Sequence, residues 1–295
     1  MQAFWAVNVP KIGFSHHYIL RLLFTLSGYH LAFECDAEND QRRKRTLLVN
    51  AATNLDLGLV GYRNALAKCN QSSATGPGFV AAMLLCYCTL AAGPTDDGDM
   101  LVCNVNGRES GHWLSVVQSF RIAHSAVDPK LIFTGLMAPM RPSTHAQTPD
   151  TRPQCQRLGV DRVCWEDALG EAYDFVCGLQ CHNRDFYMRE FEFIRLLYEA
   201  TYGKADEPYL GPEHARFVFS WLYRMKTLFN DLVYEKDPPA LVLLAYYVPL
   251  FFSMPEAWYV RSWPGHIINK VNETIGHGHK HLLRWPMKQL MNGRS

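Results

Sequence analysis

"ALVLLAYYVPLFF" runs from Ala240 to Phe252 and contains no charged residue. The run is too short to cross a bilayer, which takes about 20 consecutive apolar residues, and Pro249 interrupts it. A continuous apolar run of this kind is typical of a helix that is buried on every side. We therefore predict a core helix over 240–252 and no membrane span.

Helical spacing also dominates outside this run. "HHYILRLLFTLSGYHLAF", residues 16–33, places apolar side chains three and four positions apart, as an amphipathic helix does. "GPGFVAAMLLCYCTLAAG", residues 76–93, is apolar nearly all round and is expected at the centre of a helical layer. Further helices are expected over 109–126, 164–181, 189–202 and 212–234. Because strand signals are scarce, we predict an all-α fold, a multi-helix array of roughly ten helices.

The chain length of 295 residues allows one large domain or two small ones. Residues 138–157 are rich in Pro, Ser and Thr and have no periodic apolar pattern, so they predict a long mobile loop. The helices expected on both sides of this loop have apolar faces that need partners. We therefore predict a single domain over 1–295 with an internal loop at 138–157.

The charge balance excludes a strong overall attraction to nucleic acid. Lys and Arg number 29 against 28 Asp and Glu, a net charge of +1. The basic run "QRRKR", residues 41–45, matches nuclear-localisation and nucleic-acid patterns, but such short runs more often form the solvated start of a surface helix. The N-terminus has no pattern of a secretion signal.

The cysteines and histidines do not predict a metal site. The nine cysteines include no Cys-x-x-Cys pair, and their odd number favours free thiols in a reducing compartment. Cys177 and Cys181 are four positions apart, but no second pair at zinc-ligand spacing completes a site. In "HGHKH", His277, His279 and His281 would share a face on a strand, but the glycines between them favour a surface loop. We expect no metal and no cofactor.

No catalytic pattern emerges from the remaining motifs. The glycine clusters lack the strand–turn–helix setting and the Lys of a phosphate-binding loop, and no G-x-S-x-G elbow is present. "HSAVD", residues 124–128, holds His, Ser and Asp together, but sequence neighbours on one helix rarely form a triad. We predict no catalytic residue and a protein that is not an enzyme.

Three stretches spread over nearly the whole chain resemble parts of one protein family. The first, residues 3–33, contains Trp5, Val9, Pro10, His16, His17, Ser27, His30, Leu31 and Ala32. The second, "GHWLSVVQSFRIA" at residues 111–123, contains Trp113, Leu114 and Arg121. The third, residues 238–290, contains Ala240 to Tyr247, Trp258, Trp263, Trp285 and Pro286. The first stretch resembles the start of the regulatory domain of fungal binuclear zinc-cluster transcription factors. The second is partly similar to the Trp-Leu…Gly-Val-Arg segment of that domain, and the third resembles the C-terminus of its sterol uptake control subgroup.

The resemblance implies an all-helical dimer that binds a sterol in an apolar pocket and thereby controls nuclear entry and activation of genes. The implied partners are a sterol or another lipid-like molecule and a second copy of the chain. The implied location is the nucleus, with or without shuttling through the cytoplasm, and the implied target genes belong to sterol or secondary metabolism. The family's six-cysteine zinc cluster is absent, so we expect either a piece of a longer regulator or a natural form without that module, and no direct DNA binding by this chain.

Under this resemblance the core helix at 240–252 is also expected to form the wall of a ligand pocket. Ligand pockets are mostly apolar with a few polar groups, and Tyr and Trp combine a large apolar surface with one polar atom. The same residues are equally suited to fill a plain core. The candidate pocket residues are Leu243, Leu244, Tyr246, Tyr247, Trp258 and Trp263.

Two other functions remain open. A stand-alone co-regulator without DNA binding would keep the fold and dimerise with a full-length relative. An accessory enzyme of a fungal biosynthetic pathway would use the same apolar pocket for a substrate.

Overall fold

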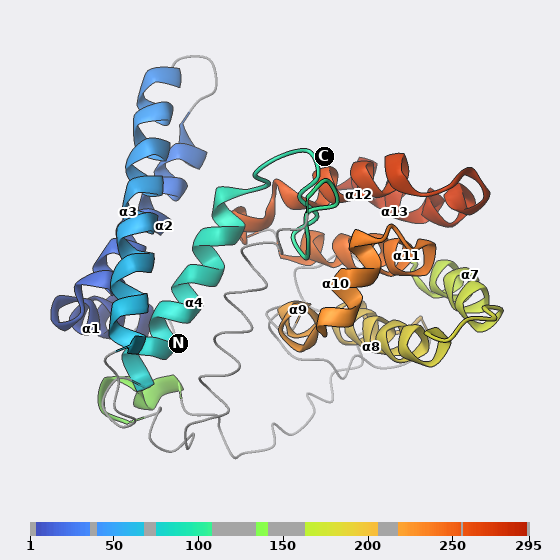
Figure 1. Cartoon of the computed structure of the whole chain (residues 1–295), viewed down its shortest axis with the longest axis horizontal. Helices are drawn as coiled ribbons and strands as arrows, with labels where there is room; N and C mark the ends of the chain where they lie inside the picture. The colour runs from blue at the N-terminus through green and yellow to red at the C-terminus, as the bar shows by residue number, and fades with distance from the viewer. Residues whose placement is uncertain are drawn as a thin grey trace. The chain divides into compact units, whose positions relative to one another are not determined.

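The computed structural model describes residues 4–35, 40–67, 75–107, 134–140, 163–205, 218–254 and 256–293. Within these ranges every regular element is a helix and none is a strand, which confirms the predicted all-α multi-helix fold (Figure 1). None of the described helices is both long enough and apolar enough to span a membrane. The predicted helix over 109–126 lies outside the described residues.

The chain divides into two compact units, where we had predicted a single domain. Unit 1 comprises 1–93 and 112–145, and unit 2 comprises 94–111 and 146–295. The single-domain prediction itself stays a prediction, since compactness alone does not establish that either unit folds by itself. Of the predicted loop at 138–157, residues 138–140 belong to a short 3-10 helix and the rest lies outside the described residues.

Unit 1 is built on two long helices that lie side by side, α2 (His17–Glu34) and α3 (Gln41–Ala67) (Figure 1). A Cβ atom at Gly58 or Gly61 of α3 would lie 2.8 Å from the side chain of Leu22 or Tyr18 of α2, so only glycine permits this close approach. The exposed basic run at 41–45 forms the first turn of α3, as predicted. The elements of unit 1 are η1 (Phe4–Asn8), α1 (Val9–Ser15), α2 (His17–Glu34), α3 (Gln41–Ala67), α4 (Thr75–Ala92) and η2 (Gly135–Met140).

Unit 2 is organised around α11 (Pro238–Tyr247), which packs against α7, α8, α10, α12 and two 3-10 helices. This position gives the helix neighbours on all sides, and every residue from Pro239 to Tyr247 is buried. The remaining elements of unit 2 are α7 (Glu166–Cys177), α8 (Arg184–Tyr202), α9 (Ser220–Arg224), α10 (Thr227–Tyr234), η4 (Val248–Ser253), η5 (Trp258–Val260), α12 (Trp263–Thr274), η6 (His277–Leu283) and α13 (Arg284–Asn292).

Two helices of unit 2 end earlier than their patterns predict. The core helix does not continue to Phe252: α11 ends at Tyr247 and the chain goes on as the 3-10 helix η4. Pro249 explains this, because it has no N–H to donate to the carbonyl four residues earlier. The helix expected over 212–234 is likewise divided, within its described part, into α9 and α10 by extended backbone at Met225 and Lys226.

This second break has a packing reason. Trp221 and Phe229 are eight positions apart, which on a straight helix would separate them by about 12 Å along the axis. Their ring centroids lie 5.0 Å apart. The chain therefore folds back at Met225 and buries both rings in one place.

The histidine segment is a 3-10 helix, η6, and not the surface loop that we predicted. Leu282 and Leu283 are buried and hold its end against the rest of unit 2. With three residues per turn, alternate positions do not share a face, so His277, His279 and His281 do not converge. The ring of His279 lies instead 5.3 Å from that of Phe175.

Candidate functional site

The candidate pocket residues fall mainly on the central helix of unit 2. Leu243, Leu244, Tyr246 and Tyr247 lie on α11, and each is at most 1% exposed. Their neighbours come from several elements, so the helix has no outward face. The structure thus brings these four side chains together in the core, and the use of this core as a pocket stays a prediction.

The two tryptophans predicted with them lie elsewhere in unit 2. Trp263 begins α12, which packs against α11, and its buried ring lies edge-on to that of His266. Trp258 is half-buried in η5, with its ring edge-on to Tyr259. Trp263 therefore belongs to an element that contacts the candidate site, whereas the ring contact of Trp258 with Tyr259 lies within η5 itself.

Aromatic rings from five other elements, α8, α9, α10, η4 and α13, gather around the end of α11. The ring of Tyr246 stacks on that of Trp285 with 5.6 Å between centroids and an interplanar angle of 9°. Tyr247 lies 4.4 Å from Trp221 and 5.3 Å from Phe251. We call the following set the aromatic shell: Tyr198, Trp221, Phe229, Tyr246, Tyr247, Phe251 and Trp285.

Several members of the aromatic shell were not predicted as site residues. Tyr198 lies on the buried face of α8, and its ring is 5.7 Å from that of Trp285. The amphipathic spacing of 189–202 placed Tyr198 on an apolar face, which was the available signal. Nothing in the local sequence indicated that Trp221 would meet α11, because that contact depends on the break after α9.

The hydroxyl groups of two shell tyrosines are already paired with the protein backbone. Tyr198 donates to the carbonyl of Tyr246 at 2.6 Å, and Tyr247 donates to the carbonyl of Val218 at 3.0 Å. Burial raises the pKa of Tyr198 and of Tyr247 well above its ordinary value, so both stay protonated donors. These two hydroxyls fix the positions of chain segments and are not free for a ligand.

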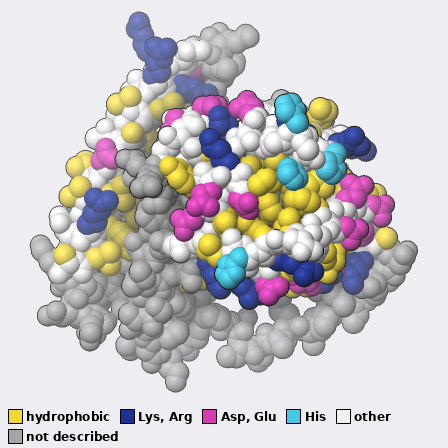
Figure 2. Space-filling view, turned by 45° about the vertical axis from the view of Figure 1, so that its right-hand side comes forward, with side chains coloured by type: hydrophobic (Ala, Val, Ile, Leu, Met, Phe, Trp, Pro, Cys, Tyr) yellow, Lys and Arg dark blue, Asp and Glu magenta, His cyan; other side chains and the backbone are white. Residues whose placement is uncertain are grey.

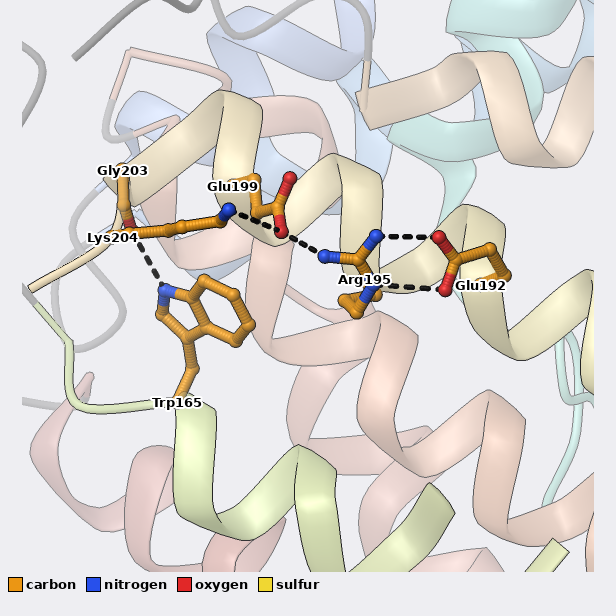
Figure 3. A network of polar contacts seen from close by, with 6 residues as sticks. All are labelled: Trp165, Glu192, Arg195, Glu199, Gly203 and Lys204. Atoms are coloured by element: carbon orange, nitrogen blue, oxygen red, sulfur yellow. Dashed lines mark hydrogen bonds and ion pairs between the residues drawn. The ribbon is translucent and has the colours of Figure 1, made fainter. Parts of the chain in front are cut away.

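Polar contacts run along α8, and one of them joins the end of α8 to the start of α7 (Figure 3). The indole Nε1 of Trp165 donates to the carbonyl of Gly203 at 3.1 Å, just beyond the end of α8. Arg195 bridges Glu192 and Glu199 on the same helix, and its hydrogen bond lowers the pKa of Glu192. These ion pairs lie within α8 and are partly exposed, so each contributes little to stability, and the buried hydrogen bond of Trp165 is the contact that joins α7 to α8.

The cysteines of the described residues are all free thiols. Burial raises the pKa of both Cys86 and Cys103 to about 12, so neither thiol forms the reactive thiolate near neutral pH. Cys177 and Cys181 do not lie on one helix, although a helix was expected over 164–181, because α7 ends at Cys177. In the part of the chain that the structure describes, no group of three or more His, Cys, Asp or Glu side chains is placed to hold a metal ion.

Comparison of the chain with models of protein families, with curated proteins and with solved structures gives no match.

Proposed function

We propose that this chain is the ligand-sensing regulatory domain of a fungal transcription regulator of the zinc-cluster type. Its ligand would be a sterol or another lipid-like molecule, held in unit 2 against α11. It would act in the nucleus, with or without shuttling, as a homodimer on sterol or secondary-metabolite genes, without itself contacting DNA or catalysing a reaction. The observation that carries the proposal is the all-round apolar α11 inside its aromatic shell.

The chemistry of this core suits a lipid. Leu243 and Leu244 present branched apolar surface, and the rings of Tyr246 and Tyr247 add flat faces of the kind that pack against fused rings. No residue of α11 is charged. A large apolar ligand would exchange protein contacts for ligand contacts here without leaving a charge unpaired.

A stand-alone dimerising co-regulator is the second candidate, and exposed apolar side chains of unit 1 favour it. Phe24 and Leu31 of α2 are 57% and 47% exposed and lie seven positions apart, so they share one face. Val49 and Val60 of α3 are 65% and 55% exposed at a spacing of eleven, again one face. Hydrophobic side chains reach the surface in several places between charged ones (Figure 2). Clustered exposure of this kind is typical of surfaces that bind another protein.

Replacing Leu244 with Trp separates a pocket wall from an ordinary core. In a pocket the indole would occupy ligand space, so we expect sterol affinity to fall by at least about tenfold while the melting temperature changes little. In a filled core the same change would overpack and destabilise the protein by about 1–3 kcal/mol. The measurements are a titration of the whole purified chain with a fluorescent sterol and a thermal melt.

The matched control is Leu196→Trp on α8, where the side chain is 46% exposed. This control adds the same indole outside the core and should change neither quantity. A parent chain that binds no sterol, together with a sharp loss of stability in the Leu244 variant, would contradict the proposal.

A further inference from the structure

Two threonines stand at a spacing from arginine that suits recognition by a protein kinase. Among the serines and threonines that the structure describes, only Thr46 and Thr227 have an arginine three positions earlier, Arg43 and Arg224. Both threonines are exposed. Kinases of the basic-directed class recognise such charges on the N-terminal side of the target hydroxyl by pairing them with carboxylates. The sequence therefore selects two threonines, and the structure distinguishes between them.

Thr46 lies in the part of α3 that opens most easily. It is the sixth residue of the helix, and its hydroxyl donates to the carbonyl of Arg42 at 3.0 Å in an exposed position. The first buried residue of α3 is Ala51, so unwinding residues 41–46 uncovers no core side chain. Helix ends fray at little cost in free energy, because their first N–H groups have no partner within the helix. A kinase that binds its substrate as an extended segment can therefore capture this stretch from the folded protein.

Thr227 has the same spacing but lies in an anchored segment. Met225, two positions before it, is 1% exposed. The guanidinium carbon of Arg224 lies 4.0 Å from the centroid of the Phe193 ring. Extending this segment into a kinase would pull the methionine out of the core and separate the arginine from the ring. The fold therefore protects Thr227 and leaves Thr46 accessible.

We propose that Thr46 is a phosphorylation site for a basic-directed protein kinase. The kinase transfers the γ-phosphoryl group of ATP to Oγ1 of Thr46, where the new P–O bond forms. The bond from the γ-phosphorus to the β-phosphate oxygen breaks, ADP leaves, and the hydroxyl proton passes to the catalytic aspartate of the kinase. This inference does not depend on the proposed ligand of unit 2.

The modification would change the charge of the basic run. The phosphate carries between about −1.5 and −2 charges at neutral pH, and it would lie one helical turn from Arg42 and Arg43. The run holds Arg42, Arg43, Lys44 and Arg45, so its net charge would fall from +4 to about +2. Phosphorylation thus weakens the attraction of this helix end for an anionic partner.

The test uses the whole purified chain, the catalytic subunit of cyclic-AMP-dependent protein kinase and magnesium ATP. Chymotrypsin cuts on both sides of the basic run and not within it, so tandem mass spectrometry of the digest locates the phosphate. Thr53 is the internal control: its hydroxyl bonds the carbonyl of Val49 at 2.9 Å on the same helix, and no basic residue stands in the four positions before it. We expect phosphate on Thr46, and on Thr53 and Thr227 at less than about a tenth of that level.

Two matched variants test the recognition. Arg43→Gln, at a side chain that is 66% exposed, should slow the labelling of Thr46 by about tenfold. Arg63→Gln makes the same change at another exposed position of α3 and should leave the rate unchanged. Circular dichroism establishes that both variants fold as the parent does.

Three results would overturn the site: no phosphate on Thr46, equal labelling of Thr46 and Thr53, or a rate that Arg43→Gln does not change. Labelling of Thr227 to the level of Thr46 would overturn the claim that the fold selects between the two threonines.

Discussion

Tyr247 illustrates at the residue scale how the core of unit 2 is fixed. Its ring lies between those of Trp221 and Phe251, and its hydroxyl is paired with the carbonyl of Val218. That Tyr247 is buried could be predicted, because an uncharged apolar run surrounds it. The acceptor of its hydroxyl group could not be predicted, because the carbonyl of Val218 lies 29 positions earlier in the chain and no local pattern connects the two residues.

We expect Tyr247→Phe to lower the free energy of unfolding by about 1–3 kcal/mol, because the carbonyl of Val218 would lose its donor in a buried place. Urea unfolding followed by circular dichroism measures this. Tyr223→Phe, at a tyrosine that is 39% exposed, is the control and should have a smaller effect. Equal stability of the Tyr247 variant and the parent would show that this hydrogen bond contributes nothing net.

At the scale of elements, the apolar patterns predicted α2 and α4 to within one residue at each end, whereas α7 ends four residues before its predicted end and α8 begins five residues before its predicted start. The patterns failed where a contact with another element decided the outcome. The break between α9 and α10 follows from the meeting of Trp221 and Phe229, and η6 follows from the burial of Leu282 and Leu283. Pro249 did lie in the sequence as a stop signal for the core helix, and the length of the apolar run led us to extend the helix past it.

The glycines of α3 allow a test of the helix pair in unit 1. Gly61→Ala would place a Cβ atom 2.8 Å from the Cβ of Tyr18, an atom too close to the backbone to move aside. We expect a net loss of stability although Ala favours a helix over Gly by about 1 kcal/mol. Gly170→Ala in α7 meets no atom within 4 Å and should stabilise the protein. Thermal melts of both variants should therefore shift in opposite directions, and a shift of both to higher temperature would contradict the close packing of α2 and α3.

At the scale of the whole molecule, burial of ionisable groups predicts how stability depends on pH. Burial raises the pKa of Tyr29 and of Tyr62 from 10.0 to about 12. The unfolded chain therefore loses these protons first, so their contribution is fully present below pH 10 and is lost as pH rises through about 12.

We thus expect the free energy of unfolding to fall between pH 10 and about pH 12. Urea unfolding at several pH values measures this fall, and ultraviolet absorbance reports tyrosinate formation. Tyr62→Phe should make the fall shallower. An unchanged slope in that variant would show that Tyr62 already ionises in the folded protein.

The grouping of residues 94–111 with unit 2 is a feature of the whole molecule that the sequence did not indicate. Residues 94–111 belong to unit 2 although they follow α4 of unit 1 directly, and the ion pair of Asp97 with Lys270 helps to hold them there. Such a long-range pairing cannot be read from local spacing. The candidate ligand residues on α11 were expected from the apolar run together with the family resemblance, whereas the contacts of Trp221 with Phe229 and Tyr247 have no signal in the local sequence.

The central claim is that unit 2 holds a lipid. Its most direct test is mass spectrometry of an organic extract of the purified full chain, after expression in a yeast that makes sterols. We predict a sterol or another lipid-like molecule at close to one molecule per chain, and much less in the Leu244→Trp variant. The blank is an extract of an unrelated protein purified in the same way. A lipid content of the parent chain no higher than that of the blank would contradict the account.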